Sequence, residues 1–204
     1  MLKANFNTDY LSSALGVIFS KFGFSPNAWT LFSLISAVIG FVCLLPQYYH
    51  SLILGVVFFM LSGLVDAIDG AVARFTKNAT DKGAYIDGIV DRYVEILLYL
   101  GLLFYSIPEV LLPSPAWLSI LIFGAAMTSF SRAYADHRKI VTKQDDLKRM
   151  GGILERFERL MLIFTGMLAG YFIDPVYITY AVMAAAILSN VTALQRVLFA
   201  VRCK

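Results

Sequence analysis

Long apolar segments separated by short loops constrain the fold of this chain more than any other feature of its sequence. A helix that crosses a lipid bilayer needs roughly 20 mostly apolar residues. Six segments meet this need, over roughly residues 28–46, 51–73, 83–107, 116–135, 157–173 and 175–201. Only 15% of the residues are charged, whereas soluble domains have roughly 25%. The sequence therefore predicts an all-α integral membrane protein with six transmembrane helices.

The segment before the first predicted span has a different pattern. Apolar side chains recur there at helical spacing, opposite Asn, Ser and Lys; they are Phe6, Tyr10, Leu11, Ala14, Leu15, Ile18 and Phe19. This pattern predicts an amphipathic juxtamembrane helix within residues 1–24 that lies in the membrane interface. Packing of that helix against the other helices is an equal alternative. The length of 204 residues suits a single domain over residues 1–204, with the six-helix bundle over residues 25–204.

Basic residues lie on only one side of the predicted membrane. All 17 Lys and Arg residues lie in or near the two termini and the loops after the second and fourth spans, and the loops near residues 47–50, 108–115 and 173–175 contain none. By the positive-inside rule, both termini and the basic loops face the cytoplasm. We expect a multi-pass protein of the plasma membrane that contacts anionic lipids. The sequence contains no nucleic-acid-binding motif, so no nucleic-acid partner is expected.

Four aspartates lie in the cytoplasmic halves of the second and third segments. A carboxylate at the centre of a membrane helix costs roughly 2.5–3.5 kcal/mol on insertion scales. Asp66 and Asp69 are three residues apart and Asp87 and Asp91 are four apart, so each pair shares a helix face. Hard cations such as Mg²⁺ prefer carboxylate oxygens and also bind substrate phosphates. The pattern therefore predicts a metal site for phosphoryl transfer, and pairing with arginines is the alternative.

The spacing of these residues resembles the signature of a known family. The sequence reads Asp66-x2-Asp69-Gly70-x2-Ala73-Arg74-x8-Gly83-x3-Asp87-x3-Asp91. This pattern resembles the CDP-alcohol phosphotransferases (CDP-alcohol phosphatidyltransferases), and the resemblance extends to their plan of six membrane helices. It implies a homodimeric membrane enzyme that transfers a substituted phosphoryl group from a CDP-alcohol donor to an acceptor hydroxyl and releases CMP.

The resemblance also implies a role for each motif residue. Asp66 and Asp87 would bridge two Mg²⁺ ions, or Mn²⁺, while Asp69 would complete the first metal site and Asp91 the second. Asp91 would also be the catalytic general base for the incoming hydroxyl. The residues that would contact the CDP donor are Asn27, Ala28, Trp29, Thr30, Gly70, Ala73, Arg74, Thr80 and Gly83.

Two further runs of sequence concern the acceptor. Residues 129–136 read Ser-Phe-Ser-Arg-Ala-Tyr-Ala-Asp, and residues 151–159 read Gly-Gly-Ile-Leu-Glu-Arg-Phe-Glu-Arg. Both runs resemble those of the phosphatidylinositol-phosphate synthases. The resemblance implies that Arg132, Arg156 and Arg196 bind the phosphate of a phosphorylated polyol such as inositol 1-phosphate. Ordinary positive-inside charge is the alternative explanation of these arginines.

Departures from that subfamily leave the substrates open. Arg132 replaces its lysine and Tyr134 replaces its arginine, and arginine and lysine differ in how they bind phosphate. The donor is expected to be a CDP-linked lipid in phospholipid biosynthesis. The alternative is CDP-inositol, which would yield a soluble inositol phosphodiester.

A cation transporter would also place aspartates inside a membrane. A transporter needs polar residues along the whole path of the ion, whereas residues 51–61 and 96–107, the outer halves of the second and third segments, are almost wholly apolar. An inactive relative that only binds partners would lack a motif aspartate, and none is missing. We therefore expect an enzyme.

Overall fold

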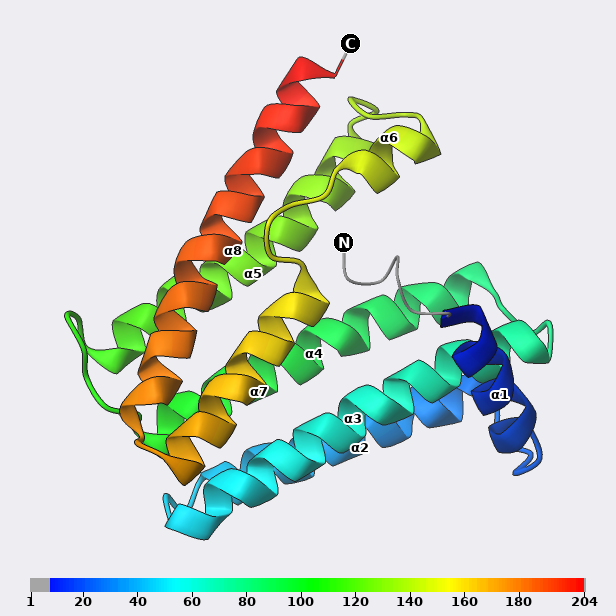
Figure 1. The fold of residues 1–204 in the computed structure, drawn as a ribbon. Coiled ribbons are helices and arrows are strands. Elements are labelled where there is room, and N and C mark those ends of the chain that lie inside the picture. The colour runs from blue at the N-terminus through cyan, green and yellow to red at the C-terminus, as the bar shows by residue number, and fades with distance from the viewer. Residues whose placement is uncertain (1–7, 204) are drawn as a thin grey trace. The chain divides into compact units, whose positions relative to one another are not determined.

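The computed structural model describes residues 8–203, and there the chain is helical apart from turns and short loops (Figure 1). The helices are α1 (Thr8–Ser20), α2 (Pro26–Leu44), α3 (Tyr49–Phe75), α4 (Asp81–Tyr105), α5 (Ser114–His137), α6 (Gln144–Arg149), α7 (Arg156–Phe172) and α8 (Val176–Arg202). Among the described residues there is no β-strand, only an isolated bridge between Val110 and Leu112. The predicted all-α fold is confirmed.

Four of the described helices, α2, α3, α5 and α8, are long and apolar enough to cross a membrane. Helix α7 has 17 residues, or about 25 Å at 1.5 Å per residue, which is short for a span. Helix α4 is longer, but Asp81, Asp87 and Asp91 lie in its N-terminal half. The structure therefore supports a helical membrane protein, and the count of six spans stays a prediction.

The chain divides into two compact units. Unit 1 comprises Met1–Pro46 and Leu54–Gly101, and unit 2 comprises Gln47–Ile53 and Leu102–Lys204. Two of the boundaries fall inside α3 and α4, where no linker composition marks them in the sequence. The single domain expected from the chain length stays a prediction.

A seam of small and hydroxyl-bearing side chains joins α2 to α3 in unit 1. Ser33 and Ser62 share a hydrogen bond (Oγ to Oγ, 3.1 Å), and Ser36 donates to the carbonyl oxygen of Phe58 (2.8 Å). A Cβ on Gly40 would lie 3.3 Å from the Cβ of Phe58. The two helices run antiparallel along this seam (Figure 1). Small residues allow such a close approach, and hydrogen bonds between helices add to it in an apolar surrounding.

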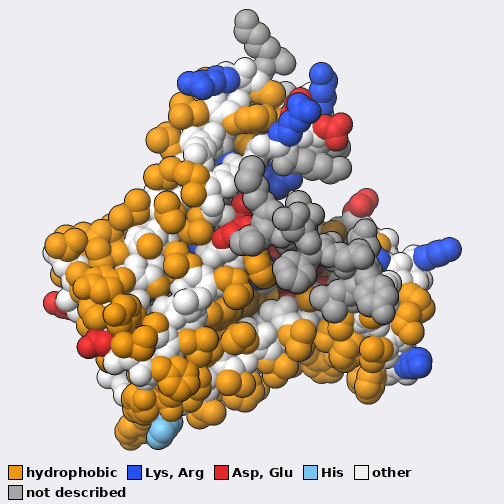
Figure 2. All heavy atoms as spheres, in the orientation of Figure 1, with side chains coloured by type: hydrophobic (Ala, Val, Ile, Leu, Met, Phe, Trp, Pro, Cys, Tyr) orange, Lys and Arg blue, Asp and Glu red, His pale blue; other side chains and the backbone are white. Residues whose placement is uncertain are grey.

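The outer face of α2 is apolar. Leu31, Ile35, Val38 and Val42 are 43–54% exposed, whereas Ser33 of the seam is buried. Apolar side chains also cover much of the surface seen in Figure 2. Polar side chains between helices and apolar side chains on the outside reverse the pattern of a soluble amphipathic helix. This arrangement fits a helix that faces lipid.

Helix α1 packs against the C-terminal part of α3. A Cβ on Gly16 would lie 2.7 Å from the Cβ of Phe75 and 2.8 Å from the carbonyl oxygen of Ala71, so only glycine allows this contact. Val17 and Ile18 of α1 are exposed. The packing alternative for this helix is therefore observed, and its place in the membrane interface stays a prediction. Phe6, Tyr10 and Leu11 of the predicted pattern lie outside the described side chains.

Helix α8 forms the buried centre of unit 2. Helix α7 lies close against it because Gly166 and Gly170 have no side chains: a Cβ on these two residues would overlap Ala181 and Ile178, respectively. Helix α5 lies along α8 as well (Figure 1), and Asn190 of α8 donates to the carbonyl oxygen of Ile120 in α5 (3.0 Å). Close packing of small residues is the usual way in which membrane helices associate.

The segment between α5 and α7 is fixed by its own apolar side chains. Val141, Leu147 and Met150 are at most 5% exposed and pack with Ala135 of α5 and Ala200 of α8. Lys143 and Arg149 of this segment are exposed and lie on this packed support.

Candidate active site

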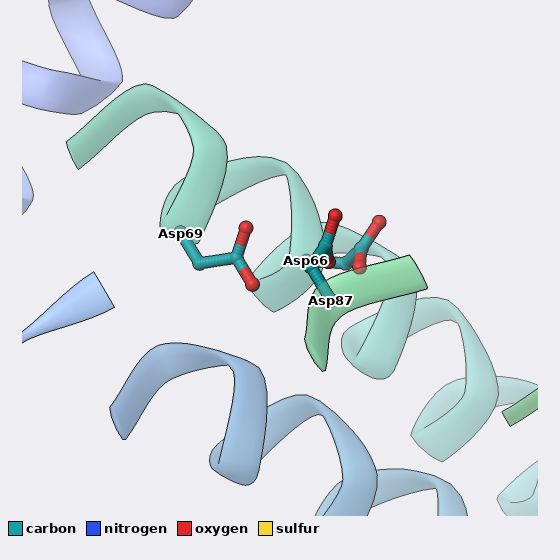
Figure 3. A group of neighbouring side chains, drawn as sticks. All are labelled: Asp66, Asp69 and Asp87. Atoms are coloured by element: carbon teal, nitrogen blue, oxygen red, sulfur yellow. The ribbon is translucent and has the colours of Figure 1, made fainter. Parts of the chain in front are cut away.

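Three carboxylates from two helices converge in unit 1. Asp66 and Asp69 lie on adjacent turns of α3, and Asp87 approaches them from α4 (Figure 3). One oxygen from each carboxylate lies within 4.8 Å of the others. Asp69 is buried, and the other two are partly buried. Carboxylate oxygens are the ligands that hard divalent cations prefer, so these side chains fit a divalent cation.

The turn between α3 and α4 brings the two helices into this arrangement. Lys77 adopts the left-handed conformation (φ 55°) just after the end of α3, which is a common way for a helix to end. The hydroxyl of Thr80 then accepts a hydrogen bond from the backbone N–H of Gly83 (3.0 Å), and Asp81 lies in the first turn of α4. A capping hydroxyl and an acidic first turn both favour a helix start. The short loop therefore returns the chain so that Asp87 faces α3.

Asp91 is not part of the group of three. Its carboxylate lies one helical turn beyond Asp87 on α4, and its Oδ2 is 3.6 Å from Nη1 of Arg92. Arg92 also donates to the carbonyl oxygen of Gly88 (3.0 Å). The structure thus brings together three of the four predicted metal ligands, and the place of Asp91 in the metal site stays a prediction.

Thr30 contacts this carboxylate group directly. Its hydroxyl donates to Oδ2 of Asp69 (2.7 Å), and both side chains are buried. The sequence pattern associated Thr30 with the nucleotide, and this bond to Asp69 could not be read from the spacing of the aspartates.

Other predicted nucleotide contacts form two small groups in unit 1. A Cβ on Gly83 would lie 3.1 Å from the Thr80 hydroxyl and 3.6 Å from Oδ1 of Asn27, so the starts of α2 and α4 lie together. A Cβ on Gly70 would lie 3.3 Å from Nη1 of Arg74, so that guanidinium lies over the glycine. Glycine at these two positions leaves the backbone open to a bulky ligand.

Three other residues predicted to contact the nucleotide make contacts within the protein that support the local fold. Ala28 donates its N–H to the hydroxyl of the capping residue Ser25 (3.3 Å) at the start of α2. The Trp29 ring packs edge-on against phenylalanines from α1, the following turn and α2. The carbonyl oxygen of Ala73 accepts from Asn78 in the α3–α4 turn. Whether these residues also contact a nucleotide stays a prediction.

The three arginines predicted to bind the acceptor belong to unit 2 and differ in exposure. Arg132 on α5 is exposed, Arg156 at the start of α7 is partly buried, and Arg196 on α8 is buried. Nη1 of Arg196 donates to the carbonyl oxygen of Thr128 (2.6 Å), and its Nη2 is 3.5 Å from Oε1 of Glu155. Arg196 therefore links α8 to α5 and to the start of α7.

The Gly-Gly run before α7 docks on α8. The N–H of Leu154 donates to the hydroxyl of Thr192 (3.0 Å), and the N–H of Ile153 donates to Oε1 of Gln195 (3.2 Å). A Cβ on Gly152 would overlap the Thr192 side chain. This docking positions Arg156, the first residue of α7. Sequence reasoning did not predict that Thr192 and Gln195 would hold this loop.

Gly152→Ala should therefore displace the docked loop. The added methyl group overlaps Thr192, and overpacking of this kind costs roughly 1–3 kcal/mol, or roughly 2–12 °C in Tm for a chain of this size. Thermal unfolding of the purified variant measures this loss. Gly151→Ala is the matched control, because a Cβ there would meet its nearest atoms only at 3.7 and 3.8 Å. Equal Tm values for the two variants would contradict the docking.

Comparison with protein families and curated proteins identifies relatives of the chain. A family model described as CDP-alcohol phosphatidyltransferase matches residues 24–200. Archaetidylinositol phosphate synthase of Methanothermobacter thermautotrophicus is 32% identical over 149 residues, which are 73% of this chain and 70% of that protein. Phosphatidylinositol phosphate synthase of Mycolicibacterium smegmatis is 31% identical over 182 residues, 86% of this chain and 77% of that protein.

Solved structures share the fold. The crystal structure of Mycobacterium tuberculosis phosphatidylinositol phosphate synthase with CDP-DAG bound matches with a TM-score of 0.76 and 22% identity, covering 95% of this chain and 94% of that chain. The same enzyme in complex with manganese and citrate matches with a TM-score of 0.74 and 21% identity, covering 94% and 89%.

Proposed function

Because the chain belongs to the CDP-alcohol phosphatidyltransferase family, we propose that it transfers a phosphatidyl-type group from a CDP-linked lipid to a phosphorylated polyol such as inositol 1-phosphate and releases CMP. The observation that carries this proposal is the convergence of Asp66, Asp69 and Asp87 within 4.8 Å. Two of the relatives are named archaetidylinositol phosphate synthase and phosphatidylinositol phosphate synthase, and these names support this acceptor.

The proposed reaction needs cations on the aspartates. Asp66, Asp69 and Asp87 would hold one Mg²⁺, and Asp91 would hold a second together with Asp66 and Asp87. When bound, the two ions would neutralise the pyrophosphate charge and stabilise the departing CMP. The manganese complex of the M. tuberculosis enzyme supports a divalent cation. Mn²⁺ is therefore a suitable substitute in experiments.

The protein groups would then orient the substrates and move one proton. Asp91 would accept the proton of the acceptor hydroxyl, whose oxygen forms a bond to the β-phosphorus as the bond to CMP breaks. Arg74 would bind phosphate oxygens of the donor with its two-pronged guanidinium. Asn27, Thr80 and Gly83, which lie together at the starts of α2 and α4, would form the nucleotide contact, with Ala28, Trp29, Thr30, Gly70 and Ala73 around it.

The acceptor phosphate would bind in unit 2. Arg196 is held by Thr128 and lies next to Glu155, while Arg132 and Arg156 would supply the remaining positive charge. A phosphate dianion is the group that an arginine cluster binds best. The three arginines therefore favour an acceptor that already carries a phosphate over a free polyol.

We also propose a topology and an assembly. The chain would cross the plasma membrane six times, with both termini and the active site in the cytoplasm, because its basic residues all lie on one side. Helix α1 would lie in the membrane interface against α3, and basic loops would contact anionic lipid headgroups. The family resemblance supports a homodimer.

A panel of donors and acceptors tests the proposed function. The purified protein, with Mg²⁺ or Mn²⁺, is supplied with CDP-DAG, CDP-archaeol or CDP-inositol and with inositol 1-phosphate, glycerol 3-phosphate or free inositol, and CMP release is measured. We expect turnover with a CDP-linked lipid and a phosphorylated polyol. Turnover only with CDP-inositol would favour synthesis of a soluble phosphodiester. Absence of CMP from every pair would falsify the proposal.

A further inference from the structure

The Asp69 carboxylate has a protein partner that the sequence pattern did not assign to it. Asp69 is 6% exposed and Thr30 is 5% exposed, and the Thr30 hydroxyl lies 2.7 Å from Oδ2 of Asp69. We propose that Thr30 is a positioning residue for the cation site: its hydroxyl sets the orientation of the Asp69 carboxylate. This inference rests on the metal chemistry of the proposed function and adds a role at the cation site to the nucleotide contact proposed for Thr30.

The geometry directs the single hydroxyl proton of Thr30 to Asp69. A second acceptor, the carbonyl oxygen of Pro26, lies 3.2 Å away on the preceding helical turn. Hydrogen bonds from a hydroxyl to a carboxylate are short, at roughly 2.5–2.7 Å, and about twice as strong as neutral ones. The shorter and charge-assisted bond is therefore the one to Asp69.

Burial makes this bond important for Asp69 in particular. Asp66 and Asp87 are partly buried, whereas Asp69 faces α2 across the buried seam. A carboxylate away from water needs donors that replace its hydration. With Oδ2 held by Thr30, the carboxylate cannot rotate freely, and its position relative to Asp66 and Asp87 is fixed before a cation binds. Hydrogen bonds of this kind to metal ligands typically change metal affinity or activity by roughly 10–100-fold when they are removed.

A purely structural role for Thr30 is the competing explanation, because the same seam contains other hydrogen bonds. The bond between Ser33 and Ser62 (3.1 Å) lies about one turn farther along α2, is equally buried, and involves no carboxylate. Ser33→Ala therefore removes a comparable helix–helix bond without touching the cation site. It is the matched control for Thr30.

The test measures Mn²⁺ binding and stability in the full chain, purified in detergent without nucleotide. Free Mn²⁺ is quantified by its electron paramagnetic resonance signal, and thermal unfolding is followed in parallel. We expect Thr30→Val to weaken Mn²⁺ binding by roughly 10–100-fold and Thr30→Ser to restore it. Ser33→Ala should lower Tm and keep the Mn²⁺ affinity of the wild type. If the extra methyl group of valine disturbs folding, Thr30→Ala removes the same hydroxyl without adding a methyl group in its place.

Two results would overturn the positioning role. In the first, Thr30→Val and Thr30→Ala bind Mn²⁺ as the wild type does and lose only thermal stability, as Ser33→Ala does. In the second, Mn²⁺ affinity is unchanged and only the KM for the CDP donor rises, which would leave Thr30 with the nucleotide contact alone. A wild type that binds no Mn²⁺ would contradict the proposed metal chemistry together with this inference, so the two failures are distinguishable.

Discussion

Asp87→Asn should reduce kcat for CMP release by roughly a thousandfold or more, because a bound cation contributes several kcal/mol to such reactions and each 1.36 kcal/mol is a factor of ten. The same variant should not be less stable than the wild type in the absence of metal. Three carboxylates with oxygens within 4.8 Å of one another repel when no cation is bound. Asparagine has the same shape and removes one of these charges. Loss of activity without loss of metal-free stability is therefore the expected combination.

Measurement of kcat and of thermal unfolding with and without Mg²⁺ checks this result. The wild type should gain stability when Mg²⁺ is added, since a ligand that binds only the folded state stabilises it, and Asp87→Asn should gain little. Asp145→Asn is the control, because Asp145 is exposed on α6 in unit 2. If Asp87→Asn kept its activity and unfolded at a markedly lower temperature, the carboxylates would serve the fold by pairing with arginines.

The convergence of Asp66, Asp69 and Asp87 was predictable because it depends on spacing within one helix and on one short turn. A spacing of three residues puts Asp66 and Asp69 on one face of α3, and a short turn brings Asp87 back to them. The helical period does not show which carboxylates along α4 belong to the group of converging aspartates. Asp91 lies four residues after Asp87, which is about 6 Å along the helix axis at 1.5 Å per residue. Helical spacing alone therefore does not decide whether Asp91 joins the group of three.

Contacts between distant segments were not predictable in the same way. The bond between Thr30 and Asp69 and the docking of Leu154 on Thr192 depend on the register between helices, which no spacing within one helix determines. The sequence did contain a weaker indication of the contact between α2 and α3. Thr30, Ser33 and Ser36 recur every three residues in an otherwise apolar helix, a pattern typical of a polar seam between membrane helices. Such a seam predicts a partner helix, although not the partner residue.

Arg196→Ala should raise the KM for the phosphorylated acceptor by roughly 10–100-fold, since hydrogen bonds to charged groups contribute roughly 1.5–3 kcal/mol. The KM for the CDP donor should stay near that of the wild type, because Arg196 is predicted to bind the acceptor phosphate and not the donor. Nη1 of Arg196 is held by the carbonyl oxygen of Thr128 at 2.6 Å, which fixes the guanidinium. Its Nη2 is only 3.5 Å from Glu155, whose side chain is 52% exposed. A phosphate dianion can take the place of so exposed a carboxylate partner.

Steady-state kinetics with the acceptor and the donor varied separately measure this effect, and Arg202→Ala is the matched control. Arg202 lies at the end of the same helix and is exposed, so its removal takes away the same charge without the buried contact. If the arginines served only the positive-inside rule, the two variants would behave alike. A rise in the donor KM alone would remove Arg196 from the acceptor site. Arg196→Lys should recover little of the loss, because one ammonium cannot bond to Thr128 and present a second donor in a fixed fork.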